Sequence, residues 1–203
     1  MLKANNINFS YHPSHLILDR INLSIKPGEV VGVHGESGVG KSTLAKIMAN
    51  YLKPDKGTIC VDGKEYPLKA RNPVQLISQH PEKAINPHWQ MKQVLEESGQ
   101  YSNQFLEALG ISKEWMHRFP SQLSGGELQR FCLARAIAPE TKYLIADEMT
   151  TMLDAITQAQ IWQAVLQFVH KQQLGVLVIS HELSLMKKVC DRILNFHELS
   201  AKI

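Results

Sequence analysis

Three glycines, a lysine and two serines lie close together in the run Gly35-Glu36-Ser37-Gly38-Val39-Gly40-Lys41-Ser42, and Thr43 follows. Glycine lets backbone N–H groups turn inward around an anion, where a Cβ would obstruct them. An apolar run, residues 30–33, precedes this loop, and a helical pattern follows it, so a helix N-terminus adds its positive dipole end there. The pattern predicts a phosphate-binding loop for a nucleoside triphosphate. Lys41 would reach the β- and γ-phosphates, and the Ser42 hydroxyl would bind Mg²⁺.

A second candidate is a pair of adjacent carboxylates, Asp147 and Glu148, at the end of the apolar run 143–146. Two acids at the end of a buried strand repel each other unless a cation or a bound water compensates. We expect Asp147 to hold Mg²⁺, usually through water, and Glu148 to orient and polarise the water that attacks the phosphate. The alternative is a solvated acidic turn, which the lysine loop on the same chain makes less attractive.

A third candidate is the helix start Leu123-Ser124-Gly125-Gly126-Glu127-Leu128-Gln129-Arg130. Ser124 can cap this helix while Gly125 and Gly126 leave the first amides bare, which predicts a second anion site. One nucleotide does not need two phosphate cradles from one chain. A two-fold pair of chains does, if each nucleotide lies between the lysine loop of one chain and the serine loop of the other.

Together these motifs, in this order, resemble those of ATP-binding-cassette (ABC) transporter ATPase subunits over essentially all 203 residues. The resemblance implies ATP with Mg²⁺ and gives roles to four more positions. Tyr11 would stack on adenine, and Gln79 would touch Mg²⁺ and the water. His181 would contact the γ-phosphate, and Asp154 would cross the dimer interface.

Three positions depart from the family pattern. Met149 stands where proline commonly follows the catalytic glutamate, and Met152 stands where a small residue is usual. Glu127 replaces the more frequent glutamine at the end of the family signature, which in this chain is Leu123-Ser124-Gly125-Gly126-Glu127. Glu127 should be tolerated, because it lies beyond the two glycines, but Met149 and Met152 leave a nucleotide-binding switch without turnover as an alternative to an ATPase.

Length and patterning favour one α/β domain over residues 1–203. The resemblance implies a P-loop NTPase (ABC ATPase) core with a mainly parallel sheet, an N-terminal antiparallel β subdomain and an inserted helical subdomain at about 86–138. The pattern agrees: short strands with alternating apolar residues fill 7–25, and helices alternate with apolar runs that end with 176–179. We expect the apolar side chains of the helical insertion to form mostly its own core.

The composition limits which classes of partner and which cellular compartment we expect for this chain. A net charge of +3 without a basic run gives no reason to expect nucleic acid. Three widely spaced cysteines predict free thiols in a reducing cytosol, and no run is long enough to cross a membrane. Nine scattered histidines do not predict direct metal binding.

The stretch 80–87 after Gln79 and Leu128-Gln129-Arg130 are similar to peptide and nickel importer ATPases. This resemblance implies a peripheral protein on the cytoplasmic face of the cell membrane, bound to transmembrane permease subunits and served indirectly by a solute-binding protein. Its second ATPase chain would be identical or different. A soluble non-transport ABC ATPase and an exporter ATPase are the alternatives.

Overall fold

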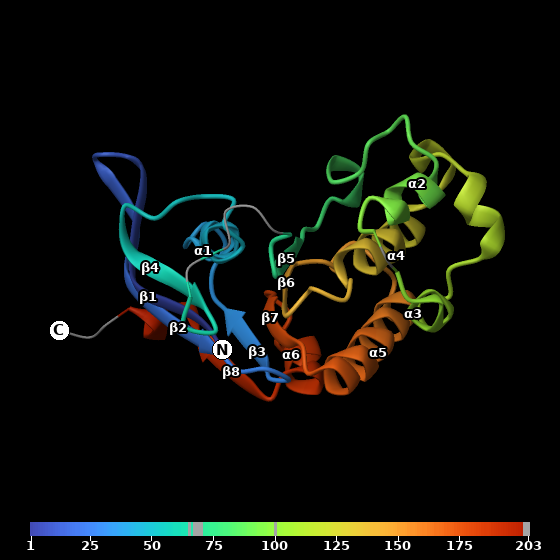
Figure 1. The fold of residues 1–203 in the computed structure, drawn as a ribbon. Helices are drawn as coiled ribbons and strands as arrows, with labels where there is room; N and C mark the ends of the chain where they lie inside the picture. Colours follow the sequence, from blue (N-terminus) through green and yellow to red (C-terminus); the bar gives the residue numbers. More distant parts are fainter. Residues whose placement is uncertain (65, 67–70, 100, 201–203) are drawn as a thin grey trace.

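The computed structural model describes residues 1–64, 66, 71–99 and 101–200 (Figure 1). A five-stranded sheet runs through its centre, and every neighbouring pair of strands in it is parallel. This confirms the predicted mainly parallel sheet. In spatial order the strands are β5 (Val74–Ile77), β6 (Tyr143–Asp147), β7 (Gly175–Ile179), β3 (Val30–His34) and β8 (Arg192–Asn195).

Alternate side chains of the central strands enter different hydrophobic clusters. In β6, Leu144 and Ala146 belong to one cluster, whereas Tyr143 and Ile145 belong to the other. Successive side chains of a strand point to opposite faces, so a sheet buried on both sides reads as a continuous apolar run. That is why these strands were recognisable in the sequence.

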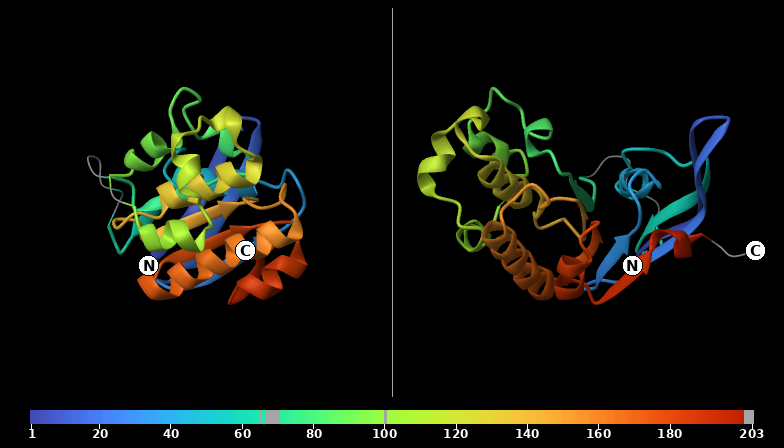
Figure 2. Two further views of the ribbon diagram at one scale, coloured as in Figure 1. Left: turned by 90° about the vertical axis from the view of Figure 1, so that its right-hand side faces the viewer. Right: turned by 180° about the vertical axis from the view of Figure 1, so that it is seen from behind.

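Helices cover both faces of the parallel sheet. Helix α1 (Lys41–Met48) shares one cluster with the antiparallel sheet, while α5 (Ala155–Gln172) and α6 (Leu183–Val189) contribute to the other. Figure 2 shows the same arrangement from two further sides. No helix among the described residues is both long and apolar enough to cross a bilayer.

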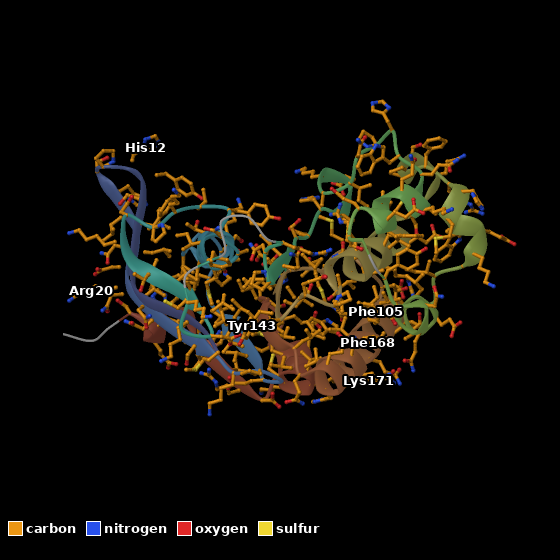
Figure 3. The ribbon with its side chains drawn as sticks, in the orientation of Figure 1. His12, Arg20, Phe105, Tyr143, Phe168 and Lys171 are labelled. Carbon is orange, nitrogen blue, oxygen red and sulfur yellow. The ribbon has the colours of Figure 1, made fainter. Side chains whose placement is uncertain are left out.

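The antiparallel sheet predicted near the N-terminus is present. Strand β1 (Leu2–His12) lies between β2 (His15–Ile25) and β4 (Lys56–Val61), antiparallel to both. The β1–β2 hairpin extends away from the rest of the chain, and His12 lies at its tip (Figure 3).

The helical insertion differs from the expectation of a private core. Its helices α2 (Met91–Glu96) and α3 (Asn103–Ala108) share one hydrophobic cluster with α4 (Gly125–Ala136), α5 and the sheet. The rings of Phe105 and Phe168 are 4.2 Å apart, which joins α3 to α5 (Figure 3). Helices of six residues bury too little area to stand alone, so they pack against the larger body.

Residues 176–179 form the last fully buried strand, but a further strand that the sequence did not predict follows it. After α6 the chain returns as β8, which lies beside β3 with Gly32 opposite Ile193. All four residues of β8 are half-buried and two are polar, so no apolar run marks this edge strand.

Candidate nucleotide-binding site

The glycine-rich loop joins the end of β3 to the start of α1, and two of its glycines have left-handed backbone angles. Gly38 has φ +84° and Gly40 has φ +109°. A Cβ on Gly40 would lie 2.9 Å from Leu18 Cδ2 and 3.0 Å from Ile17 Cγ2. Such contacts are too short for carbon atoms, so the β2 side chains fit against this loop only because Gly40 has no side chain.

The side chain of Lys41 turns back into this loop. Its Nζ atom donates hydrogen bonds to the carbonyl oxygens of Gly35 at 2.8 Å and Glu36 at 2.7 Å. Only 7% of Lys41 is exposed, so the ammonium group is fixed beneath the loop. A cation held beside inward-turned backbone N–H groups suits an anionic ligand.

A pocket of about 500 Å³ lies over this loop and gathers most of the predicted nucleotide-binding residues. Four further lining residues were not predicted: Ile17, Lys46, Ser78 and His80. Lys46 could have been found, because it lies one helical turn beyond Ser42 and so shares its face of α1. The predicted residues that line the pocket are Tyr11, Ser37, Gly38, Gly40, Lys41, Ser42, Thr43, Gln79, Asp147 and Glu148.

Asp147 is the last residue of β6 and lines this pocket. Its Oδ1 atom is buried and has no hydrogen-bond partner among the described residues. Burial raises the pKa of the carboxyl group and the charge of Glu148 adds to this, while Ser42, Lys46 and Lys41 act in the opposite direction. A buried carboxylate oxygen without a partner, beside a serine hydroxyl, fits a hard cation such as Mg²⁺.

Glu148 follows Asp147 with φ +52°, a conformation that costs a residue with a side chain about 1 kcal/mol or more. Its N–H donates to the carbonyl oxygen of Ile179 at 3.0 Å, across the ends of β6 and β7. Its Oε1 atom lies 3.4 Å from Nδ1 of His181. Two predicted catalytic residues that are 33 positions apart therefore meet at the ends of neighbouring strands.

Tyr11 connects the hairpin to the glycine-rich loop. Its hydroxyl group lies 3.3 Å from Oγ1 of Thr43, and Phe9 packs edge-on at 4.9 Å. Tyr11 is nonetheless 53% exposed. An exposed aromatic ring whose position is fixed at both ends is suited to stack on a base.

The signature residues line a different pocket, of about 400 Å³. Ser124 caps α4: its Oγ accepts from the N–H of Glu127 at 3.3 Å, and the Glu127 carboxylate accepts from the N–H of Ser124 at 2.6 Å. Glu127 thus completes a capping box, which explains why a glutamate is accommodated here. Ser124, Gly125 and Gly126 line this pocket with Asp154, and Gln79 lines both pockets.

Asp154 caps α5, since its Oδ1 accepts from the N–H groups of Ile156 at 3.1 Å and Thr157 at 3.0 Å. Hydrogen bonding to Thr157 lowers the pKa of this carboxyl group. Of the two unusual methionines, Met149 is buried in the core and Met152 is 64% exposed beside Asp154. Only Met152 can therefore contact a second chain without rearrangement.

In the part of the chain that the structure describes, no three His, Cys, Asp or Glu side chains come together in a way that could hold a metal ion. The scatter of the histidines along the sequence is kept in space: His12 is at the hairpin tip, and His181 lies beside Glu148.

Comparisons with known proteins bear on this geometry. The ABC transporter family model matches residues 18–151. A nickel import system ATP-binding protein, NikE of Staphylococcus aureus, is 34% identical over 96% of this chain and 85% of its own. The chain belongs to the ABC transporter ATP-binding family. It is accordingly an ATP-binding ABC ATPase that hydrolyses ATP.

Two solved structures are similar to this ABC ATPase at 25% identity. One is a dimer of the ATP-binding cassette MJ0796 in a post-hydrolysis state bound to ADP and Pi, with a TM-score of 0.82 over 96% of this chain and 94% of that one. The other is cbiO1 of Clostridium perfringens, part of the ABC transporter complex cbiONQ, with a TM-score of 0.80 over 96% and 83%. These confirm the predicted family and fold.

Proposed function

We propose that this chain is the energy-coupling ATPase of an ABC importer and that it works as one of two paired cassettes. One observation carries the proposal: the lysine loop and the signature residues line separate pockets of the same chain. Each half lacks what the other supplies. A second cassette turned by a two-fold axis would bring its Ser124 to the Lys41 pocket of the first and complete both sites.

In this pocket the residues would share the work of phosphoryl transfer. Lys41 and the loop amides would hold the β- and γ-phosphates, and Tyr11 would stack on adenine. Mg²⁺, held by Ser42, Asp147 and Gln79, would neutralise charge on the phosphate oxygens.

Hydrolysis itself would depend on the Glu148–His181 pair. Glu148 would accept a proton from the attacking water while His181 donates a hydrogen bond to the γ-phosphate. A bond forms between the water oxygen and the γ-phosphorus as the bridging bond to ADP breaks.

Residues 1–203 would act as one ABC ATPase domain, with the helical subdomain at about 86–138 inserted in it. We assign permease docking to a pocket of about 750 Å³ where β5 and residues 97–99, which follow α2, meet α4. A permease segment seated there would touch Leu76 and Ile77, which lead directly to Gln79. Movement of the permease would thereby change the position of Gln79 in the nucleotide pocket.

The NikE relative supports an importer of nickel or, by the resemblance of 80–87, of peptides. The chain would sit at the cytoplasmic face of the membrane, bound to permease subunits and served indirectly by a solute-binding protein. The second cassette would be a copy of this chain or a related chain. A soluble ABC ATPase and an exporter ATPase are the weaker candidates.

Complementation between two inactive variants tests the shared site. Lys41→Ala removes the phosphate contact, and Gly125→Asp places a carboxylate where phosphate would bind. A Cβ on Gly125 meets no described atom within 4 Å, so this substitution should fold. Each variant alone should be inactive. A mixture should regain activity, because a mixed pair has one site with both Lys41 and an unmodified signature.

The mixture distinguishes the possible arrangements when it is made with and without the permease. If the mixture regains ATPase activity without any other cassette chain, copies of this chain pair with each other. In the other case, the mixture of variants regains no ATPase activity, while the wild-type rate per molecule rises when a different cassette chain is added. This combination shows that the chain pairs with a different chain. A wild-type rate per molecule independent of concentration, in a strict monomer, would contradict the shared site.

A further inference from the structure

A buried polar network connects the loop that follows β6 with the loop that follows β7. At its centre is the hydroxyl group of Thr150, which is 2% exposed. It accepts hydrogen bonds from Nε1 of Trp162 at 3.1 Å and from Nε2 of Gln158 at 3.2 Å. Both donors lie on α5. A serine or threonine hydroxyl can accept two hydrogen bonds, so the Thr150 oxygen is fully used.

The side-chain amide of Gln158 also reaches the second loop. Its Nε2 atom lies 3.4 Å from the carbonyl oxygen of Thr150 and 3.5 Å from Oε2 of Glu182. Glu182 is held in turn, because its N–H donates to Oγ of Ser180 at 3.0 Å and its Oε1 accepts from Ser184 at 3.1 Å. One side chain thus bridges the two loops beside the 3.4 Å contact between Glu148 and His181.

The same residue is one helical turn from Asp154. The N–H of Gln158 donates to the carbonyl oxygen of Asp154 at 2.9 Å, while the Asp154 carboxylate caps this helix. A displacement of Asp154 would move the first turn of α5 and the Gln158 amide with it. Because Thr150 and Glu182 are bonded to that amide, both loops would follow.

We propose that Gln158 is a positioning residue for ATP hydrolysis: by joining Thr150 to Glu182, it sets the separation of Glu148 and His181 and links it to the position of Asp154. The inference rests on the proposed roles of Glu148 and His181. Hydrolysis is sensitive to such positioning, since a misplacement of about 1 Å can cost 10²-fold in rate. Binding of ATP uses other residues of the pocket and does not depend on this bridge.

Steady-state kinetics of Gln158→Glu test the proposal. The new carboxylate faces the carboxylate of Glu182 and the carbonyl oxygen of Thr150, so the bridge opens with almost no change in size. We expect kcat to fall about tenfold or more, with the KM for ATP within about twofold of wild type. Gln163→Glu is the matched control, because it makes the same change at an exposed position of α5 and should leave kcat unchanged.

Exchange of the two partners separates positioning from a general loss of structure. Glu182→Gln alone keeps an acceptor for Gln158 and should cost at most about twofold in kcat. In the double variant Gln158→Glu/Glu182→Gln, the amide and the carboxylate change places, but the carbonyl oxygen of Thr150 still faces the carboxylate. We therefore expect partial recovery, with kcat at least about threefold above that of Gln158→Glu. Thr150→Val removes the shared acceptor in nearly the same volume and should lower kcat, whereas Thr150→Ser should retain it.

Three results would overturn the inference: a wild-type kcat in Gln158→Glu, a loss of kcat that the exchange does not reduce at all, or losses that simply follow Tm across the series. Glu148→Gln, measured alongside, distinguishes this from failure of the proposed function. If Glu148→Gln hydrolyses ATP at the wild-type rate, the proposed catalytic site itself is wrong. If Glu148→Gln is impaired and Gln158→Glu is not, only the positioning role fails.

Discussion

The ammonium nitrogen of Lys41 lies 2.8 Å from the carbonyl oxygen of Gly35, so the lysine closes the loop that precedes it. This contact holds the only long cationic side chain of the loop beneath the backbone N–H groups that face the pocket. The charge is therefore in place before a phosphate arrives, and little side-chain entropy remains to be lost when ATP binds.

Lys41→Ala should lower the affinity for ATP by about 10²-fold or more, because a charge-assisted contact to the phosphates is lost and two carbonyl groups lose their donor. Equilibrium binding of a fluorescent ATP analogue measures this directly. Lys53→Ala changes an exposed lysine just beyond α1 and should leave the affinity unaltered. Equal affinities in the two variants would remove Lys41 from the phosphate site.

Gly40→Ala should destabilise the protein by about 1–3 kcal/mol, because the new methyl group would overlap Leu18 and Ile17 at a strained backbone angle. Gly38→Ala is the matched comparison: its φ is also left-handed, but no described atom lies within 4 Å of the added Cβ. In urea unfolding, the free energy of unfolding of Gly40→Ala should therefore be lower than that of Gly38→Ala. The reverse order would argue against the close approach of β2 to this loop.

Glu148→Gln should reduce the rate of ATP hydrolysis by about 10²–10⁴-fold while ATP still binds, because the amide cannot accept a proton from water. Phosphate release under saturating ATP is the measurement. Glu107→Gln, at an exposed position of α3, is the control for the chemical change itself. Similar rates for all three proteins would mean that the protein uses another base.

Asp147→Asn should stabilise the nucleotide-free protein at neutral pH. Burial raises the pKa of this carboxyl group above its ordinary value of 3.8, so the folded chain retains a proton that the unfolded chain has released. The contribution of this carboxyl group to the free energy of unfolding is therefore greatest at low pH and decreases as the pH rises above about 4. The variant should show a smaller fall in Tm between pH 4 and 7, since asparagine has no charge to bury. An unchanged pH profile would contradict this.

Ser124→Gly should separate helix capping from hydrolysis. Glycine is a tolerable N-cap, so the variant should lose only a few tenths of a kcal/mol, whereas Ser124→Ala should lose about 1 kcal/mol. If the hydroxyl also contacts a phosphate on the partner cassette, both variants should hydrolyse ATP more slowly than wild type. Hydrolysis at the wild-type rate in Ser124→Gly would limit the serine to capping.

Features that depend on neighbouring residues were predictable from the sequence. The left-handed angles of Gly38 and Gly40, the capping of α4 by Ser124 and the continuous apolar run of β6 are all features of short stretches. Local geometry fixes spacings at two residues per strand repeat or three to four per helical turn, so a short stretch contains the information. The phosphate loop and the acidic strand end were found for this reason.

Contacts across the fold were decided by packing. The sequence does not show that β8 closes the sheet beside β3, that Phe105 meets Phe168, or that Ile17 and His80 line the nucleotide pocket. These depend on which faces are buried against each other, and the distance between partners along the chain has no fixed period. By itself the sequence determined the chemical groups and their local shapes. Only the tertiary structure brought Glu148 to His181 and kept the signature apart from the lysine loop, because sheet order and shared burial, rather than spacing, set which strand ends are neighbours.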